Sequence, residues 1–232
     1  MCAFDWWLKK IQDWHDQHDS WLLTNELELE LPETPQEQLH WPTLPREIIR
    51  KEGDRHSVAM AHWGLVPPWA DDPKVGRLSY NARSETVSEK PTFRKPFRDQ
   101  RCLMLATAYG ERADMTVSKQ PIKVTIQGGK PFAYAGLWES WTKGGVPYLS
   151  CTMITTTPNE IVADFNSRMP VVLREEDYDV WLDPNSSAED LKALFVPYSA
   201  EEMKVELAEL PPRQVKKKVD PAQASLDFDT GD

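Results

Sequence analysis

FAYAGLW at residues 132–138 and YLSCTMIT at residues 148–155 are the stretches that decide the fold class. Both are short runs of aromatic, β-branched and small apolar residues without proline, a pattern typical of buried β-strands. Three further runs of this kind lie upstream, at His56–Trp63, Arg101–Tyr109 and Ile122–Ile126. Many short strands with few helices between them predict an α+β fold with a mixed, barrel-like β core and peripheral helices.

The helices are expected outside this strand-rich region. Residues 5–23 carry Trp and Ile at three- and four-residue spacing, which predicts an amphipathic helix. Thr157-Pro158-Asn159-Glu160 reads as a capping box with proline at the first helical position. Short helices are also expected at Glu175–Leu182 and at Ala188–Phe195, the second capped by Ser187. Four prolines make residues 31–45 an expected extended loop.

Length and composition limit the function classes. The 232 residues fit one large domain, expected at residues 1–210, followed by a charged, flexible tail at residues 211–232. No stretch reaches the roughly 20 apolar residues of a membrane span. Three widely spaced cysteines without a CxxC motif favour reduced thiols in the cytoplasm and no metal site. No motif indicates a cofactor.

The charge is uneven along the chain. The net charge of −10 argues against indiscriminate nucleic-acid binding. However, the middle of the chain is rich in arginine and lysine between Arg77 and Arg112. This basic middle is compatible with a DNA-binding face, and equally with solvated loops.

Cys2 is the residue with the most distinctive chemistry. Once Met1 is removed, an N-terminal cysteine carries an amine and a thiol on adjacent carbons, and the two together convert an aldehyde into a thiazolidine ring. The usual pKa values, near 8 for the amine and about 8.5 for the thiol, leave both groups partly nucleophilic at neutral pH.

Several motifs, in order and spacing, resemble the SRAP (SOS response-associated peptidase) family. The resemblance runs from about residue 57 to 184 and includes Cys2. Its motifs are Cys2, Trp63–Trp69, Asn81–Thr86, Arg101–Leu103 with Glu111 beyond it, Phe132–Glu139, Ser150–Thr156 and Arg168–Leu173.

The resemblance implies covalent trapping of abasic sites in single-stranded DNA through Cys2, a thiol peptidase- or lyase-type chemistry. Glu111 matches the family's active-site carboxylate and is expected to act as general acid and base. DNA-positioning roles fall on Asn81, Arg83, Trp69 and Arg168. The family also implies self-removal of the residues before Cys2, although methionine aminopeptidase can remove Met1 as well.

Three departures make this chain a divergent member. Ala3 and Phe4 stand where the family has glycine and a DNA-contacting arginine. Asn166 stands where the family has a histidine, and an amide cannot deliver a proton near neutral pH. Residues 39–43 match the family's Asn-x-Ala-Pro loop poorly. A catalytically weakened DNA or replisome adaptor is therefore the alternative function, and a cysteine hydrolase using His62 is a second.

The tail carries one candidate partner motif. Gln223-Ala224-Ser225-Leu226-Asp227-Phe228 fits the pattern of peptides that dock on the bacterial sliding clamp. An acidic tail without a partner is the competing interpretation.

Overall fold

The computed structural model describes residues 4–8, 37–111 and 121–208. Its centre is a closed ring of five strands. Strand β10 pairs with β4 in parallel, and all other neighbours in the ring (β4–β3, β3–β6, β6–β9 and β9–β10) are antiparallel. The strands are β3 (Pro45–Glu52), β4 (Arg55–Trp63), β6 (Arg101–Ala106), β9 (Phe132–Trp141) and β10 (Tyr148–Thr156). The single parallel pairing makes the barrel mixed, which confirms the fold class expected from the sequence.

A second, antiparallel sheet lies against the barrel. Its order is β13 (Met203–Leu207), β8 (Ile122–Ile126), β7 (Ala108–Glu111), β1 (Phe4–Leu8) and β2 (Glu37–His40). Only Thr107 separates β6 from β7, so the chain passes directly from the barrel into the second sheet. The strand predicted at Arg101–Tyr109 is therefore two strands in two sheets.

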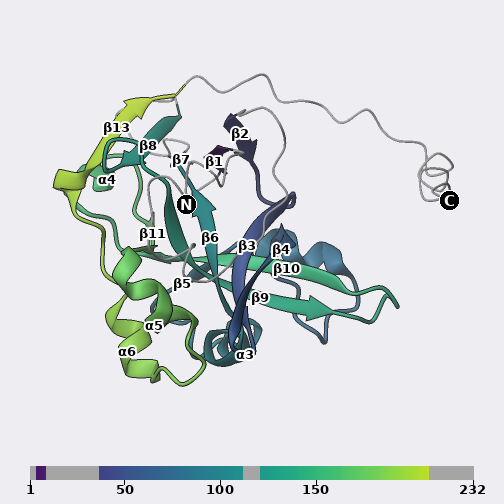
Figure 1. The fold of residues 1–232 in the computed structure, drawn as a ribbon. Coiled ribbons are helices and arrows are strands. Elements are labelled where there is room, and N and C mark those ends of the chain that lie inside the picture. The colour runs from purple at the N-terminus through teal and green to yellow at the C-terminus, as the bar shows by residue number, and fades with distance from the viewer. Residues whose placement is uncertain (1–3, 9–36, 112–120, 209–232) are drawn as a thin grey trace, which may run out of the picture.

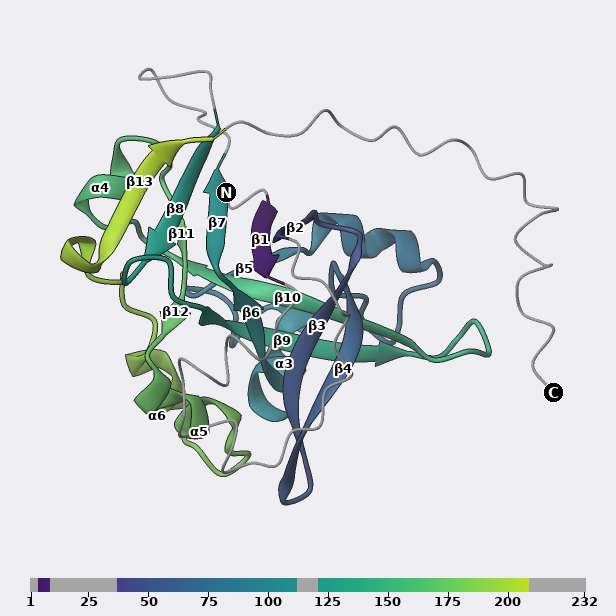
Figure 2. The same ribbon diagram turned by 45° about the horizontal axis from the view of Figure 1, so that its top comes forward.

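Helices cover the side of the barrel away from the second sheet (Figures 1 and 2). They are α3 (Pro91–Asp99), α5 (Tyr178–Leu182) and α6 (Ala188–Ala193); α4 (Glu160–Ala163) lies near β13. Shorter elements are the strands β5 (Asn81–Arg83), β11 (Met169–Pro170) and β12 (Val172–Leu173) and the 3₁₀ helices Pro73–Leu78, Glu175–Asp177 and Ala200–Glu202.

Alternation along the barrel strands creates two cores. One set of side chains packs with the helices, as in the contact cluster that holds Leu103, Leu137 and Trp181. The opposite set packs inside the ring and continues into the second sheet; Trp63 and Tyr109 belong to it. Successive side chains of a strand point to opposite faces, and β6, β9 and β10 are buried on both sides along most of their length, whereas much of β4 is partly exposed.

Two predictions near the N-terminus are wrong. Phe4–Leu8 is a strand, not the start of a helix, because β1 forms backbone pairs with β2 on one edge and with β7 on the other. Residues 9–23 of the predicted helix lie outside the described residues. Within the predicted loop at residues 31–45, Glu37–His40 forms β2 and Pro45 begins β3.

The helix caps are partly as expected. Asn159, not Thr157, caps α4: its side chain accepts a hydrogen bond from the Val162 amide at 3.0 Å. Ser187 caps α6 by accepting from the Asp190 amide, as predicted. The tail at residues 211–232 lies outside the described residues. No helix in the described part is long and apolar enough to cross a membrane.

Candidate active site

Glu111 and Asn166 form the centre of the candidate site. Glu111 ends β7 and is fully buried, and Asn166, only 4% exposed, follows α4. The Asn166 Nδ2 donates a hydrogen bond to the Glu111 Oε2 at 2.7 Å. Two residues that are 55 positions apart, and that the sequence singled out separately, are therefore in direct contact.

The burial of Glu111 changes its acidity. Loss of contact with water raises the pKa of the Glu111 carboxyl to about 8, and this effect outweighs the lowering effect of the hydrogen bond from Asn166. The carboxyl is therefore mostly protonated at neutral pH. A buried, protonated carboxylic acid can donate a proton and then act as a base, which suits general acid–base chemistry.

The local fold fixes the Asn166 side chain. The backbone N–H of Asn166 donates to the Val162 carbonyl at 2.9 Å, and this bond closes the turn that follows α4. Its Oδ1 accepts from the Arg168 amide at 3.1 Å. With the oxygen held in this way, the Nδ2 is directed to Glu111.

Arg168 connects this pair to β10. Its guanidinium donates to the Glu85 Oε2 at 3.0 Å and also to the Thr155 carbonyl. The hydrogen bond from the Arg168 guanidinium lowers the pKa of the Glu85 carboxyl. The Arg168 side chain is only 14% exposed. Arg168 is thus held against Glu85 and Thr155, and its role toward DNA stays a prediction.

Asn81 and Arg83 lie beside the same end of β10. Strand β5 runs parallel to β10, with Asn81 opposite Met153 and Arg83 opposite Thr155. Arg83 is exposed, and its guanidinium makes no ion pair within the described part of the chain. The structure thus brings Glu111, Asn166, Arg168, Asn81 and Arg83 to one end of the barrel.

Trp69 and His62 lie towards the other end of β10. Trp69 is 52% exposed, and its carbonyl accepts from Lys143 in the β9–β10 hairpin at 2.8 Å. His62 pairs with Ser150, five residues and about 16 Å along the strand from Thr155. His62 therefore does not take the place of the family histidine beside Asn166.

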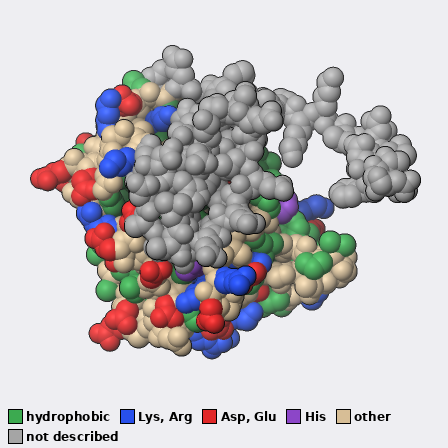
Figure 3. Space-filling model, viewed as in Figure 1, with side chains coloured by type: hydrophobic (Ala, Val, Ile, Leu, Met, Phe, Trp, Pro, Cys, Tyr) green, Lys and Arg blue, Asp and Glu red, His purple; other side chains and the backbone are tan. Residues whose placement is uncertain are grey.

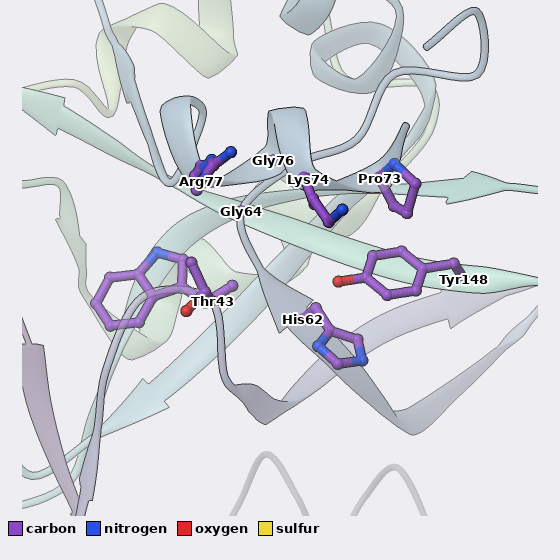
Figure 4. A pocket seen from close by; sticks show the side chains of 9 residues that line it. Thr43, His62, Gly64, Pro73, Lys74, Gly76, Arg77 and Tyr148 are labelled. Atoms are coloured by element: carbon purple, nitrogen blue, oxygen red, sulfur yellow. The ribbon is translucent and has the colours of Figure 1, made fainter. Parts of the chain in front are cut away.

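His62 lines a separate pocket of about 380 Å³ (Figure 4). Its ring stacks on that of Tyr148 at 4.4 Å, and Lys74 and Arg77 reach the pocket from the 3₁₀ helix opposite. The nearest cysteine in the register is Cys151, which is opposite Trp63. Burial raises the pKa of the Cys151 thiol to about 12, and it also raises the pKa of Cys102. Thiols held protonated in this way disfavour the cysteine hydrolase alternative.

Charges of both signs are interspersed on the described surface that faces the viewer in Figure 3. The basic middle of the sequence does not form a continuous basic face in this view. Within residues 4–8, 37–111 and 121–208, no three His, Cys, Asp or Glu side chains gather where they could hold a metal ion.

Cys2 lies outside the described residues. The strand that follows it is described, however, and its register is informative. Phe4 is opposite Gly110, Asp5 is opposite Tyr109, and Glu111 is the next residue of β7. Sequence reasoning missed this pairing, and it also missed the buried Asp5–Arg46 ion pair, because both are contacts between segments distant in the chain.

The mixed barrel has counterparts among solved structures, and the sequence matches a known family. The family model described as "SOS response associated peptidase (SRAP)" matches residues 23–219. The chain therefore belongs to the SRAP family.

The relatives agree with this assignment. The chain is 43% identical over 159 residues to "Abasic site processing protein YoqW" of Bacillus subtilis. The alignment covers 67% of this chain and 70% of YoqW. It is 29% identical over 167 residues to "Abasic site processing protein HMCES" of Gallus gallus, over 60% of this chain and 50% of that protein.

Solved structures match the fold. A protein from Bordetella bronchiseptica aligns with a TM-score of 0.74 and 25% identity, over 90% of this chain and 100% of that one. A protein from Bacteroides thetaiotaomicron gives the same TM-score at 23% identity, over 90% and 92% of the two chains.

Proposed function

We propose that this protein processes abasic sites in single-stranded DNA by trapping them covalently through Cys2. The observation that carries the proposal is the pairing of β1 with β7, because Phe4 lies opposite Gly110, next to Glu111. Two residues of extended chain span at most about 7 Å, so a chain that begins two residues before Phe4 is short enough to bring Cys2 to the Glu111 carboxyl. The names of YoqW and HMCES as abasic site processing proteins support the same substrate.

The reaction needs an aldehyde and the two nucleophiles of Cys2. The Cys2 amine attacks the carbonyl carbon of the ring-opened abasic sugar, and loss of one water gives an imine. The thiolate then attacks the imine carbon, and the nitrogen takes up a proton to close the thiazolidine. Removal of Met1, by Cys2 itself or by methionine aminopeptidase, is required because it frees the amine.

Glu111 is the acid and base of this scheme. With a pKa raised to about 8 by burial, its carboxyl holds a proton that it can give to the departing hydroxyl of the carbinolamine. Asn166 transfers no proton, since an amide does not titrate. It instead orients the carboxyl through the 2.7 Å hydrogen bond. General acid–base help is typically worth about 10²–10⁴-fold, so loss of the family histidine slows the reaction without preventing it.

DNA is held by the residues around β5. The exposed Arg83 guanidinium suits a phosphate, and Asn81 suits the sugar or the Cys2 amine. Single-stranded DNA is the expected form, since an abasic sugar in a single strand is accessible without opening a duplex. The proposed place of action is the cytoplasm.

A denaturing gel tests the proposal. Protein lacking Met1 is incubated with single-stranded DNA that carries one abasic site, and Cys2→Ser is run beside it. The proposal expects a heat-stable, shifted band only with Cys2 present. The same protein with intact DNA of equal sequence controls for binding without chemistry.

The adaptor alternative rests on one observation, the presence of Asn166 in place of a proton-donating histidine. It expects DNA binding that Cys2→Ser leaves unchanged and no covalent product. A sliding clamp is a further proposed partner through Gln223–Phe228, which lie outside the described residues. Removal of residues 223–228 would then abolish clamp binding and leave DNA trapping intact.

A further inference from the structure

A buried ion pair joins the N-terminal strand to the barrel. Asp5 of β1 is fully buried, and Arg46 of β3, only 1% exposed, donates a hydrogen bond from Nη1 to its Oδ2. The pair therefore connects the second sheet to the inside of the ring. Asp5 lies three residues after Cys2 in the sequence.

Arg46 is held firmly on the barrel side. Its Nη2 donates to the Leu105 carbonyl of β6 at 2.6 Å, and its guanidinium lies over the Trp63 ring at 5.2 Å. On the other side of Asp5, the His40 Nδ1 is 3.6 Å from the Asp5 Oδ1. The two oxygens of the Asp5 carboxyl thus face different groups, Oδ2 the fixed guanidinium of Arg46 and Oδ1 the ring of His40.

A buried ion pair is an expensive way to attach a strand. Taking both charges out of water offsets much of their attraction, and apolar residues of similar size usually stabilise a fold at least as well. What the pair adds is specificity for one arrangement, because leaving either charge without its partner in the interior is strongly unfavourable. The pair therefore favours one register of β1 over the alternative registers.

The sequence of β1 makes this specification necessary. The strand is Phe-Asp-Trp-Trp-Leu, and Asp5 is its only charged residue. A five-residue strand that is otherwise apolar can slide along its neighbour, and each slip changes which residues meet. A slip by two positions would take the Asp5 side chain away from Arg46 and leave the buried guanidinium without a carboxylate.

We propose that Asp5 and Arg46 are positioning residues for Cys2: their ion pair fixes the register of β1 against β7 and so places the N-terminal cysteine beside Glu111. This inference rests on the proposed function of Cys2 as the trapping nucleophile. In the observed register, Asp5 opposite Tyr109 sets Phe4 opposite Gly110. Effective concentration depends steeply on such placement, and an error of about 1 Å can cost about 10²-fold in rate.

The test uses a double variant of the full chain, Asp5→Leu with Arg46→Met, which removes both charges and keeps apolar volume. Glu139→Gln is the matched control. Glu139 of β9 is a buried carboxylate (3% exposed) that accepts a hydrogen bond from Gln100, the residue after α3, and it lies away from β1. Three rates or affinities are measured: single-turnover crosslinking at saturating abasic DNA, binding of intact single-stranded DNA, and reaction of Cys2 with glyoxylate as a small aldehyde.

The proposal expects a folded double variant with unchanged DNA affinity, whose Cys2 amine and thiol still react with glyoxylate. Its crosslinking rate on DNA falls at least about tenfold, while Glu139→Gln keeps the wild-type rate. A folded double variant that crosslinks DNA at the wild-type rate overturns the proposal. If the wild-type chain reacts with glyoxylate but never with abasic DNA, the proposed function fails instead.

The register is also measured without any DNA chemistry. Cysteines introduced by Trp6→Cys and Ala108→Cys lie opposite each other in β1 and β7 and report the observed register as a disulfide. Added to the double variant, the same two cysteines should give less of this disulfide, and residue 6 should instead trap a cysteine introduced by Gly110→Cys. Equal disulfide yields with and without the ion pair overturn the proposal, whatever the outcome on DNA.

Discussion

The Asn166 side chain donates a hydrogen bond to Glu111 at 2.7 Å inside the fold, where its family has a histidine. Both side chains are almost fully buried, and the hydrogen bond joins the amide to the carboxyl. The amide can orient the carboxyl but cannot exchange protons with it. Of these two side chains only Glu111 can transfer a proton, and the consequences can be measured.

Asn166→His should accelerate crosslinking. A histidine in this place adds a second titratable group beside Glu111, and the expected gain is up to about 10²-fold in the single-turnover rate. Asn185→His, in an exposed turn, is the control for adding a histidine elsewhere. A folded Asn166→His protein with no gain in rate would show that proton transfer at this position does not limit the reaction.

Glu111→Gln should change how stability depends on pH. The Glu111 carboxyl has a pKa of about 8 in the fold and an ordinary value of 4.5. Between these values the unfolded chain loses its proton while the folded chain keeps it, so the free energy of unfolding falls as the pH rises. Below about pH 4.5 the carboxyl is protonated in both states and adds no further pH dependence.

Urea unfolding at several pH values measures this effect. The wild type should lose a few kcal/mol relative to Glu111→Gln between pH 4.5 and 8, since one pKa unit is worth about 1.4 kcal/mol. Burial also raises the pKa of Asp5 to about 6, so some slope should persist in the variant below that pH. Parallel curves for the two proteins over the whole range would contradict a buried, protonated Glu111.

Arg83→Ala should weaken binding of intact single-stranded DNA. Loss of one phosphate contact lowers the affinity for all sequences and reduces the slope of log affinity against log salt by about 1. Lys192→Ala removes an exposed cation from α6, on the helical side of the barrel, and should change neither quantity. Titrations by fluorescence anisotropy at three salt concentrations decide the matter, and equal slopes for Arg83→Ala and wild type would exclude this contact.

Gly64→Ala should destabilise the fold more than Gly53→Ala. Gly64 has a φ of +148°, and a Cβ there would lie 2.5 Å from the Gly76 carbonyl oxygen. Gly53 has a φ of +62° with open space around it. We expect a loss of about 3 kcal/mol at Gly64 and about 1–2 kcal/mol at Gly53, measured by thermal or urea unfolding. The reverse order would contradict the close packing of the Gly64 backbone against that of Gly76.

The strands could be predicted from the sequence because their signals are local. Ile122–Ile126 was predicted to the residue, and Phe132–Trp138 lies within β9, which continues to Trp141. Closure of the ring could not be predicted, since it depends on the parallel pairing of β10 with β4, more than 80 residues earlier in the chain. The resemblance to a known family supplied what local patterns could not.

The N-terminal segment shows where sequence patterns mislead. The spacing of tryptophans predicted a helix at residues 5–23, yet pairing with β2 and β7 makes Phe4–Leu8 a strand. The candidate site was predicted residue by residue through the family motifs. The contact between Glu111 and Asn166, and the burial that raises the pKa of Glu111, became apparent only in three dimensions.

Covalent trapping at Cys2 is measured by the intact mass and peptide map of the product formed with abasic single-stranded DNA. We expect a mass equal to protein plus DNA minus one water, with the sugar attached to the N-terminal peptide at Cys2. The adduct should survive without chemical reduction, as a thiazolidine does. An adduct on a lysine that survives only after borohydride reduction, or no adduct on a chain that still binds the DNA, would contradict it.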